Sequence, residues 1–150
     1  MPLSLPVWAR AHVEAYLDRL TLERRLSPNT VASYRRDLES FFTFVDAAGV
    51  SGLGSVDRRL VRRYVADLSA REFASRSIAR KASAVRAFYS DAVRRSMVEI
   101  NPAEGISVPR APQSLPRVIP SATLTAALDQ LDDGDPVTLR DRAILELLYG

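Results

Sequence analysis

Apolar side chains recur at helical spacing between Ser27 and Gly49. They fall on one face of a helix, at Val31, Tyr34, Leu38, Phe41, Phe42 and Val45. Ser27 can accept hydrogen bonds from the free amides of a first turn, and Pro28 suits the first helical position, where its missing N–H is not needed. The pattern predicts an amphipathic helix that begins at Pro28 and stops near Gly49.

Three further segments of the first hundred residues have the same periodicity. A first helix is expected over residues 7–24, Asp57 can cap a third helix, and Ser75 or Ser77 opens a fourth that runs to about Arg95. The apolar positions are Leu60, Val61, Tyr64, Val65 and Leu68 in the third helix and Ile78, Ala82, Val85, Phe88, Tyr89, Ala92 and Val93 in the fourth. Residues 1–100 are therefore predicted to form an all-α domain of four helices.

The remaining third of the chain changes character at Asn101. Residues 101–120 contain five prolines and almost no periodicity, which favours an extended, stiff linker. Residues 121–150 predict a helix over 122–131 and another from about Val137. The apolar stripe of that last helix, which includes Ile144, Leu147 and Leu148, is too long for the short segment to bury, so we expect a chain cut inside a second domain.

Charge separates the same two parts of the chain. Residues 1–100 have 17 basic against 11 acidic side chains, a surplus of six, whereas residues 101–150 have 4 against 7. This asymmetry points to a polyanion as the partner of the first part, with nucleic acid as the leading candidate and a merely soluble, arginine-rich surface as the alternative. Of the 21 basic residues all but Lys81 are Arg, which reflects either a GC-rich genome or a preference for bidentate phosphate contacts.

Composition excludes several classes of protein. With 47% hydrophobic and 26% charged residues, the chain is too apolar for intrinsic disorder. No apolar run is long enough to cross a bilayer, and the start does not resemble a signal peptide, so a cytoplasmic protein is expected. Without Cys and with one His, it offers neither disulfides nor a zinc site, and neither its glycines nor its acidic run fits a nucleotide or calcium loop. We expect no metal and no cofactor.

Polar side chains on the second and fourth helices form the candidate binding surface. They are Asn29, Thr30, Ser33, Arg35 and Arg36 on the second helix, and Arg76, Ser77, Arg80, Lys81, Ser83, Ala84, Arg86 and Ala87 on the fourth. Small residues let a helix approach a duplex closely, and Arg donates paired hydrogen bonds to phosphate or guanine. The alternative is a solvated face with salt links such as Arg35 to Glu39. No catalytic set is evident, since Tyr34, Tyr64 and Tyr89 occupy apolar stripes.

Several stretches resemble the core-binding, SAM-like domain of the tyrosine site-specific recombinases, the phage integrase superfamily. They are LSPNTV at 26–31, YRRDL at 34–38, SAVRAFY at 83–89 and NPA at 101–103. The XerC branch of that family is especially similar, through residues 101–105, 108–112, 115–116, 139–146 and 149–150. The resemblance covers nearly the whole chain.

The resemblance implies a helical domain that clamps one face of DNA and a catalytic domain that closes on the other. In such proteins the catalytic arginine and the nucleophilic tyrosine would follow Gly150, and Tyr149 is not that nucleophile. This fragment should therefore be inactive. The DNA contacts implied are Thr30, Arg35, Arg36, Ser77, Arg80, Lys81, Ser83 and Arg86.

The intact protein, by the same resemblance, cuts one DNA strand through a 3′-phosphotyrosine bond and rejoins it through a Holliday junction, without metal or nucleotide. Its expected partners are duplex DNA, identical subunits and a XerD-like recombinase, and its expected role is the resolution of chromosome dimers at cell division. Two alternatives stay open. One is a phage or transposon integrase of the same superfamily, and the other is a non-catalytic helical DNA-binding regulator.

Overall fold

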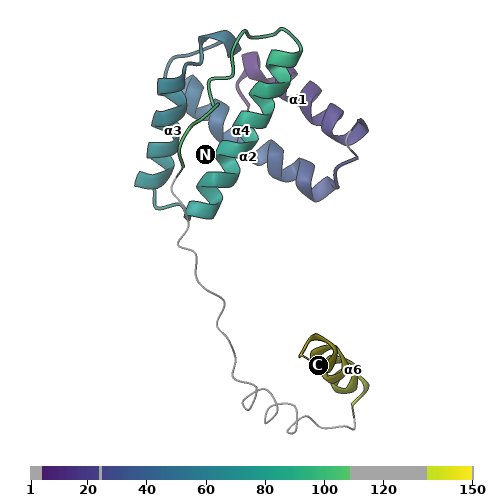
Figure 1. Ribbon diagram of the computed structural model, residues 1–150. Helices are drawn as coiled ribbons and strands as arrows, with labels where there is room; N and C mark the ends of the chain where they lie inside the picture. The colour runs from purple at the N-terminus through teal and green to yellow at the C-terminus, as the bar shows by residue number, and fades with distance from the viewer. Residues whose placement is uncertain (1–4, 24, 109–134, 150) are drawn as a thin grey trace. The chain divides into compact units, whose positions relative to one another are not determined.

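The computed structural model describes residues 5–23, 25–108 and 135–149, which fall into two compact units, Met1–Pro112 and Gln113–Gly150 (Figure 1). The first unit contains α1 (Val7–Leu22), α2 (Pro28–Ala47), a 3-10 turn η1 (Leu53–Ser55), α3 (Arg58–Ala70) and α4 (Ser75–Arg94). The second contains α6 (Pro136–Tyr149). The regular secondary structure of the described residues is helical and includes no strand, which confirms the all-α prediction.

The helix boundaries follow local chemistry. Ser27 Oγ accepts the Thr30 amide at 3.3 Å, and Asp57 Oδ1 accepts the Leu60 amide at 2.7 Å, so both predicted caps form. Gly49, with φ of +79°, ends α2 in a Schellman turn, in which its N–H donates to the Asp46 carbonyl at 2.9 Å. The N–H of Val50 donates the second hydrogen bond of this turn, to the Val45 carbonyl at 3.2 Å.

All four helices of the first unit contribute to its core, which includes an aromatic cluster of α2, α3 and α4. The ring of Phe41 meets that of Tyr64 with centroids 5.1 Å apart, and Phe42 meets Phe88 at 5.3 Å, both edge to face. Tyr64 and Tyr89 are each 1% exposed or less. Burial raises the pKa of Tyr64 to about 12, although its hydroxyl donates to Ser40 Oγ at 3.0 Å, and burial also raises the pKa of Tyr89. These two tyrosines are core residues, as the apolar stripes indicate.

The segment 101–108 packs on the bundle and does not leave it at residue 100. Asn101 donates from its amide to the Arg86 carbonyl at 3.0 Å and to Ser90 Oγ at 2.9 Å. Ala103 and Ile106 are 1% and 5% exposed, because these apolar side chains lie between the prolines and can be buried against the helices. The first compact unit consequently extends to Pro112, beyond the predicted boundary. The rest of the predicted linker and the helix expected over 122–131 lie outside the described residues.

The second unit is described only in α6, which begins at Pro136, next to the expected start at Val137. Leu147 and Leu148 are 85% and 73% exposed, and Ile144 is 48% exposed. Within the described parts of both units, no helix is both long and apolar enough to span a membrane.

Candidate nucleic-acid interface

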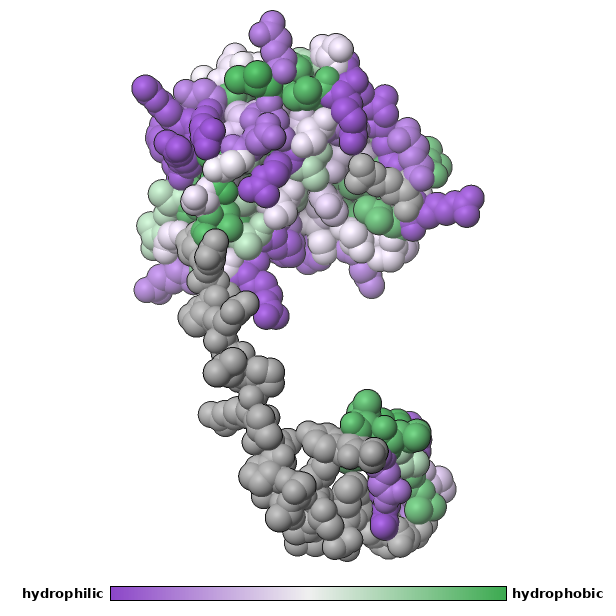
Figure 2. Space-filling view, in the orientation of Figure 1, coloured by the Kyte–Doolittle hydropathy of each residue, from purple (hydrophilic) through white to green (hydrophobic). Residues whose placement is uncertain are grey.

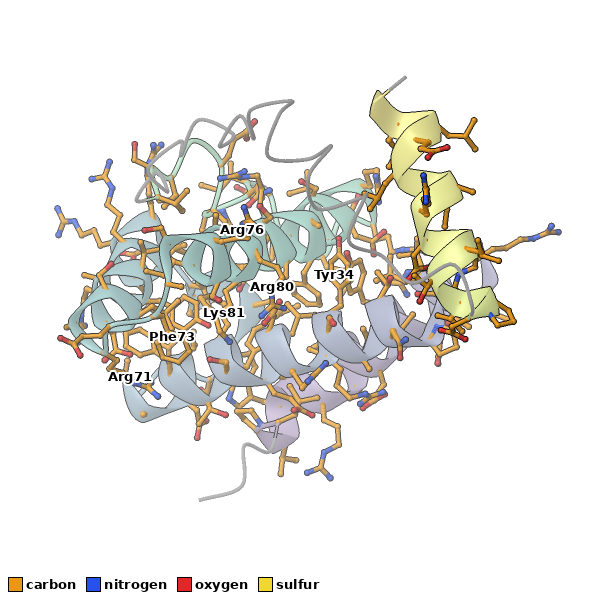
Figure 3. The ribbon with its side chains drawn as sticks, turned by 90° about the horizontal axis from the view of Figure 1, so that it is seen from below. Tyr34, Arg71, Phe73, Arg76, Arg80 and Lys81 are labelled. Carbon is orange, nitrogen blue, oxygen red and sulfur yellow. The ribbon has the colours of Figure 1, made fainter. Side chains whose placement is uncertain are left out.

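A groove runs between α2 and α4 and reaches the C-terminal end of α3 (Figure 3). We call it the α2–α4 groove. Its volume is about 560 Å³, and its lining is Ser33, Arg36, Asp37, Ser40, Thr43, Phe44, Ala47, Asp67, Arg71, Phe73, Arg80 and Lys81. A smaller hollow adjoins it and is lined by Thr30, Ser33, Tyr34, Asp37, Arg80, Ser83 and Ala84. Four cations and two carboxylates face the groove, so its local charge is positive.

Asp37 is a buried residue of the groove lining, 2% exposed. Its Oδ2 accepts a hydrogen bond from Nη1 of Arg80, and Nζ of Lys81 lies 3.4 Å from Oδ1. The side chain of Arg80 is 52% exposed, whereas that of Lys81 is 10% exposed. One buried carboxylate therefore compensates two cations of α4, and it holds the Arg80 guanidinium through Nη1 while the side chain stays half exposed.

Phe73 lies near the α3 side of the groove, between two cations. The guanidinium carbon of Arg71 lies 5.3 Å from the Phe73 ring centroid, and Lys81 Nζ lies 5.7 Å from it. Arg71 also pairs with Asp67 at 3.4 Å, one turn back on α3. Figure 3 shows Arg71, Phe73, Lys81 and Arg80 following one another along the groove.

Hydroxyl groups line the N-terminal turns of α2. Thr30 Oγ1 lies 2.9 Å from Ser27 Oγ, and Ser33 Oγ donates to the Asn29 carbonyl at 2.9 Å. Arg36 is exposed, and its Nη2 lies 3.5 Å from Ser33 Oγ. These short polar side chains leave the backbone of α2 open to close approach by a partner.

Arg35 lies outside the groove, although it belongs to the predicted site. It faces α1, where its two terminal nitrogens donate to both oxygens of Glu14, with Nη2 to Oε2 at 2.6 Å. The hydrogen bond from Arg35 lowers the pKa of Glu14 below its usual range, and the same bond raises the pKa of Arg35. The salt link to Glu39 expected as an alternative is replaced by this link between helices.

Arg86 and Ser77 are also absent from the lining of the groove. Arg86 donates from Nε to the Ala103 carbonyl at 3.2 Å and from Nη2 to the Ile106 carbonyl at 3.4 Å. It therefore holds the segment 101–108 against α4. Ser77 is half-buried in the first turn of α4, near the exposed Arg76. Thr30, Arg36, Arg80, Lys81 and Ser83 are the predicted residues that the structure brings together.

Sequence reasoning missed the role of Asp37. A signal was available, because Thr30, Ser33 and Asp37 are spaced by three and four residues and so share one face of α2. Phe73 offered no such signal, since it stands between helices in the sequence and reaches the groove through the turn that joins α3 to α4.

The described residues contain no group of three or more His, Asp or Glu side chains that could hold a metal ion. What the groove offers is arginine, lysine and hydroxyl donors around a single buried carboxylate. Such a set suits hydrogen bonding to phosphates and base edges.

Comparison with known proteins agrees with this chemistry. Residues 13–96 match the model of the phage integrase N-terminal SAM-like domain. The chain is 37% identical over 138 residues to tyrosine recombinase XerC of Shigella flexneri and of Escherichia coli K12. That alignment covers 92% of this chain and 46% of each relative, so the chain spans about half the length of the curated relatives it matches. Since the family model covers more than half of its residues, the chain belongs to the phage integrase family through its N-terminal SAM-like domain.

Proposed function

We propose that the helical bundle is the DNA-binding part of a XerC-like tyrosine recombinase, and that the α2–α4 groove faces the duplex. The observation that supports this most is the convergence of Arg36, Arg80 and Lys81 on one groove in a member of the phage integrase family. Two helices with hydroxyl and small side chains between the cations are compatible with entry into a major groove.

The polar residues of α2 and α4 have different tasks in this proposal. Arg80, held by Asp37, presents a fixed guanidinium to a base edge or phosphate, and Lys81 adds charge from below it. Thr30, Arg36, Ser77 and Ser83, with the exposed Arg76 of the first α4 turn, contact the DNA backbone. Arg35 and Arg86 act through their partners, because Arg35 ties α2 to α1 and Arg86 ties 101–108 to α4.

The whole protein, on this proposal, cuts and rejoins DNA as a tyrosine recombinase in the cytoplasm. Its partners are identical subunits and a XerD-like recombinase, and its role is the resolution of chromosome dimers at cell division. We assign strand cleavage to the catalytic domain of the whole recombinase, so the 150-residue chain alone should form no covalent complex with DNA.

Fluorescence anisotropy with a labelled duplex, between about 50 and 200 mM salt, tests the proposal. The chain should bind, and each phosphate contact should contribute roughly 0.9 to the slope of log K against log salt. The variant R36Q/R76Q should bind less tightly and with a slope lower by up to about 2. The matched control R10Q/R140Q loses the same charge from exposed sites on α1 and α6, away from the proposed DNA-binding helices α2 and α4, and should keep the slope of the unmodified chain. Equal losses in both variants would refute the assignment of the groove.

A further inference from the structure

Among the described helices of the bundle, arginines without an ion pair are most numerous on α3, which does not carry the binding surface predicted from the sequence. In α1, α2 and α4, most cations face carboxylates. Arg19 and Arg94 pair with Asp91, at 2.6 and 2.9 Å, and Arg35, Arg80 and Lys81 pair with Glu14 or Asp37. On α3, by contrast, Arg59, Arg62 and Arg63 are exposed and form no ion pair with any residue of the described ranges.

These three arginines, which we call the α3 arginine face, point away from the core. The buried side of α3 consists of Leu60, Val61, Tyr64, Val65 and Leu68. Arg62 and Arg63 follow Arg59 by three and four residues, so the three side chains lie together on the outward side of the helix within two turns. Figure 2 shows hydrophilic side chains gathered over the part of the bundle where Figure 1 places α3. Arg58 is not part of this face, because its Nη2 donates to the Gly105 carbonyl at 3.1 Å.

The α3 arginine face is separate from the α2–α4 groove. The groove meets α3 only at the C-terminal end of the helix, through Asp67 and Arg71. Arg63 precedes Arg71 by eight residues and Arg59 precedes it by twelve, which correspond to about 12 and 18 Å along the helix axis. Asp67, which is acidic, lies between Arg63 of the α3 arginine face and Arg71 of the groove along the helix. One continuous row of cations therefore does not join them.

The chemistry of this face fits a phosphate backbone better than a protein. The large apolar side chains that are exposed in the described residues, such as Val7, Leu22 and Ile100, do not include any from α3. Protein interfaces usually rest on such apolar or aromatic anchors, whereas non-specific DNA binding rests on Arg and Lys alone. Neighbouring side chains on this helix face lie about 5–6 Å apart, which allows adjacent arginines to meet successive phosphates.

We propose that the α3 arginine face binds the phosphate backbone of a second DNA duplex while the α2–α4 groove holds the first. This inference rests on the proposed function only in that the groove is taken to bind the first duplex. The second contact is independent of sequence, since it involves phosphates and no base edges. One protomer then bridges two duplexes.

Co-sedimentation of two duplexes tests this inference. Two duplexes of equal length carry different dyes and are mixed with the 150-residue chain at about 50 mM salt, and the fraction of complexes that contain both dyes is measured. The variant R59Q/R63Q removes two exposed cations from the α3 arginine face. The variant R10Q/R140Q is the control, with the same loss of charge elsewhere. Anisotropy with one duplex measures binding at the groove in parallel.

The unmodified chain and R10Q/R140Q should bring both dyes together. R59Q/R63Q should lower the two-dye fraction at least five-fold while its affinity for the first duplex changes less than three-fold. Absence of two-dye complexes with the unmodified chain, or equal bridging by R59Q/R63Q, would overturn the inference. So would a large loss of single-duplex affinity in R59Q/R63Q, because the α3 arginine face would then belong to the first interface. Failure of the proposed function has another signature, namely unchanged single-duplex binding in R36Q/R76Q.

Discussion

Removing the charge of Asp37 should destabilise the bundle far more than a surface ion pair would. In Asp37→Asn, the side chain keeps its size, but the ammonium of Lys81, whose side chain is only 10% exposed, loses its carboxylate. Breaking a buried pair by removing one partner costs about 3–5 kcal/mol. Because the Arg80 side chain is 52% exposed and can turn to water, we expect the lower end, about 3 kcal/mol.

Urea denaturation followed by circular dichroism at 222 nm measures this loss. For a bundle of this size, about 3 kcal/mol corresponds to a Tm lower by roughly 10–20 °C. The double variant D37N/K81M removes the stranded cation as well and should recover at least about half of the loss. Asp67→Asn is the matched control, because its pair with Arg71 is exposed and one turn apart on the same helix, and it should cost about 0.5 kcal/mol or less.

Two outcomes would refute the reasoning. If Asp37→Asn costs no more than Asp67→Asn, the buried carboxylate does not compensate Lys81 in solution. If D37N/K81M is as unstable as D37N, the loss comes from somewhere other than the stranded ammonium. The m-value should stay constant throughout, since a changed slope would mean that the variants alter the compactness of one of the two states.

Three further predictions concern the helix ends, the acidic groups and the segment 101–108. Gly49→Ala should cost about 1–2 kcal/mol in urea denaturation because φ there is +79°, whereas Gly54→Ala, with open space and ordinary φ, should cost much less; equal costs would contradict the strain argument. The pKa of Glu14 is lowered by its hydrogen bond to Arg35, and that of Asp91 is lowered because hydrogen bonds from Arg94 and Arg19 outweigh the opposing effect of burial. The two carboxylates therefore contribute their full share to folding stability above the ordinary pKa values of 4.5 and 3.8, and this share is lost as pH falls below them. Thermal melts should show a Tm that falls from about pH 4.5 downward. A Tm that stays constant to about pH 2.5 would contradict this prediction. Arg86→Met should remove two hydrogen bonds to the segment 101–108. Amide hydrogen exchange at Ala103 should become at least ten-fold faster, while the exchange of core amides in α2 stays unchanged. Unaltered exchange at Ala103 would show that apolar burial alone holds the segment.

The four helices of the first unit could be predicted from the sequence because local chemistry determines them. Ser27, Asp57 and Gly49 occupy the positions where caps and a left-handed turn are needed, and apolar periodicity supplies the buried faces. The same periodicity could not place 101–108, since Ala103 and Ile106 are buried by contact with helices far back in the chain.

The candidate site was only partly predictable, because the partner of an arginine is a matter of tertiary structure. Arg35 and Arg36 are neighbours in sequence, yet one faces Glu14 on α1 and the other faces the groove. Arg80 and Arg86 both lie on the polar side of one helix, but Arg80 donates to the Asp37 carboxylate, whereas Arg86 donates to backbone carbonyls of the segment 101–108. Counting charges along the chain does not show which arginines are paired, and it passed over α3, where Arg59, Arg62 and Arg63 form no ion pair within the described residues.

The link between Asn101 and α4 has a mechanical consequence. A single helix lines the groove with Arg80 and Ser83 and, one or two turns later, anchors the following segment through Arg86 and Ser90. Arg80 and Arg86 are six residues apart, or about 9 Å along the axis. Because one helix carries both sets of contacts, a partner that displaces α4 at the groove also displaces the segment 101–108 that α4 holds. A pull on the segment 101–108 would likewise reach α4 through Arg86 and Asn101, and from there the residues that line the groove.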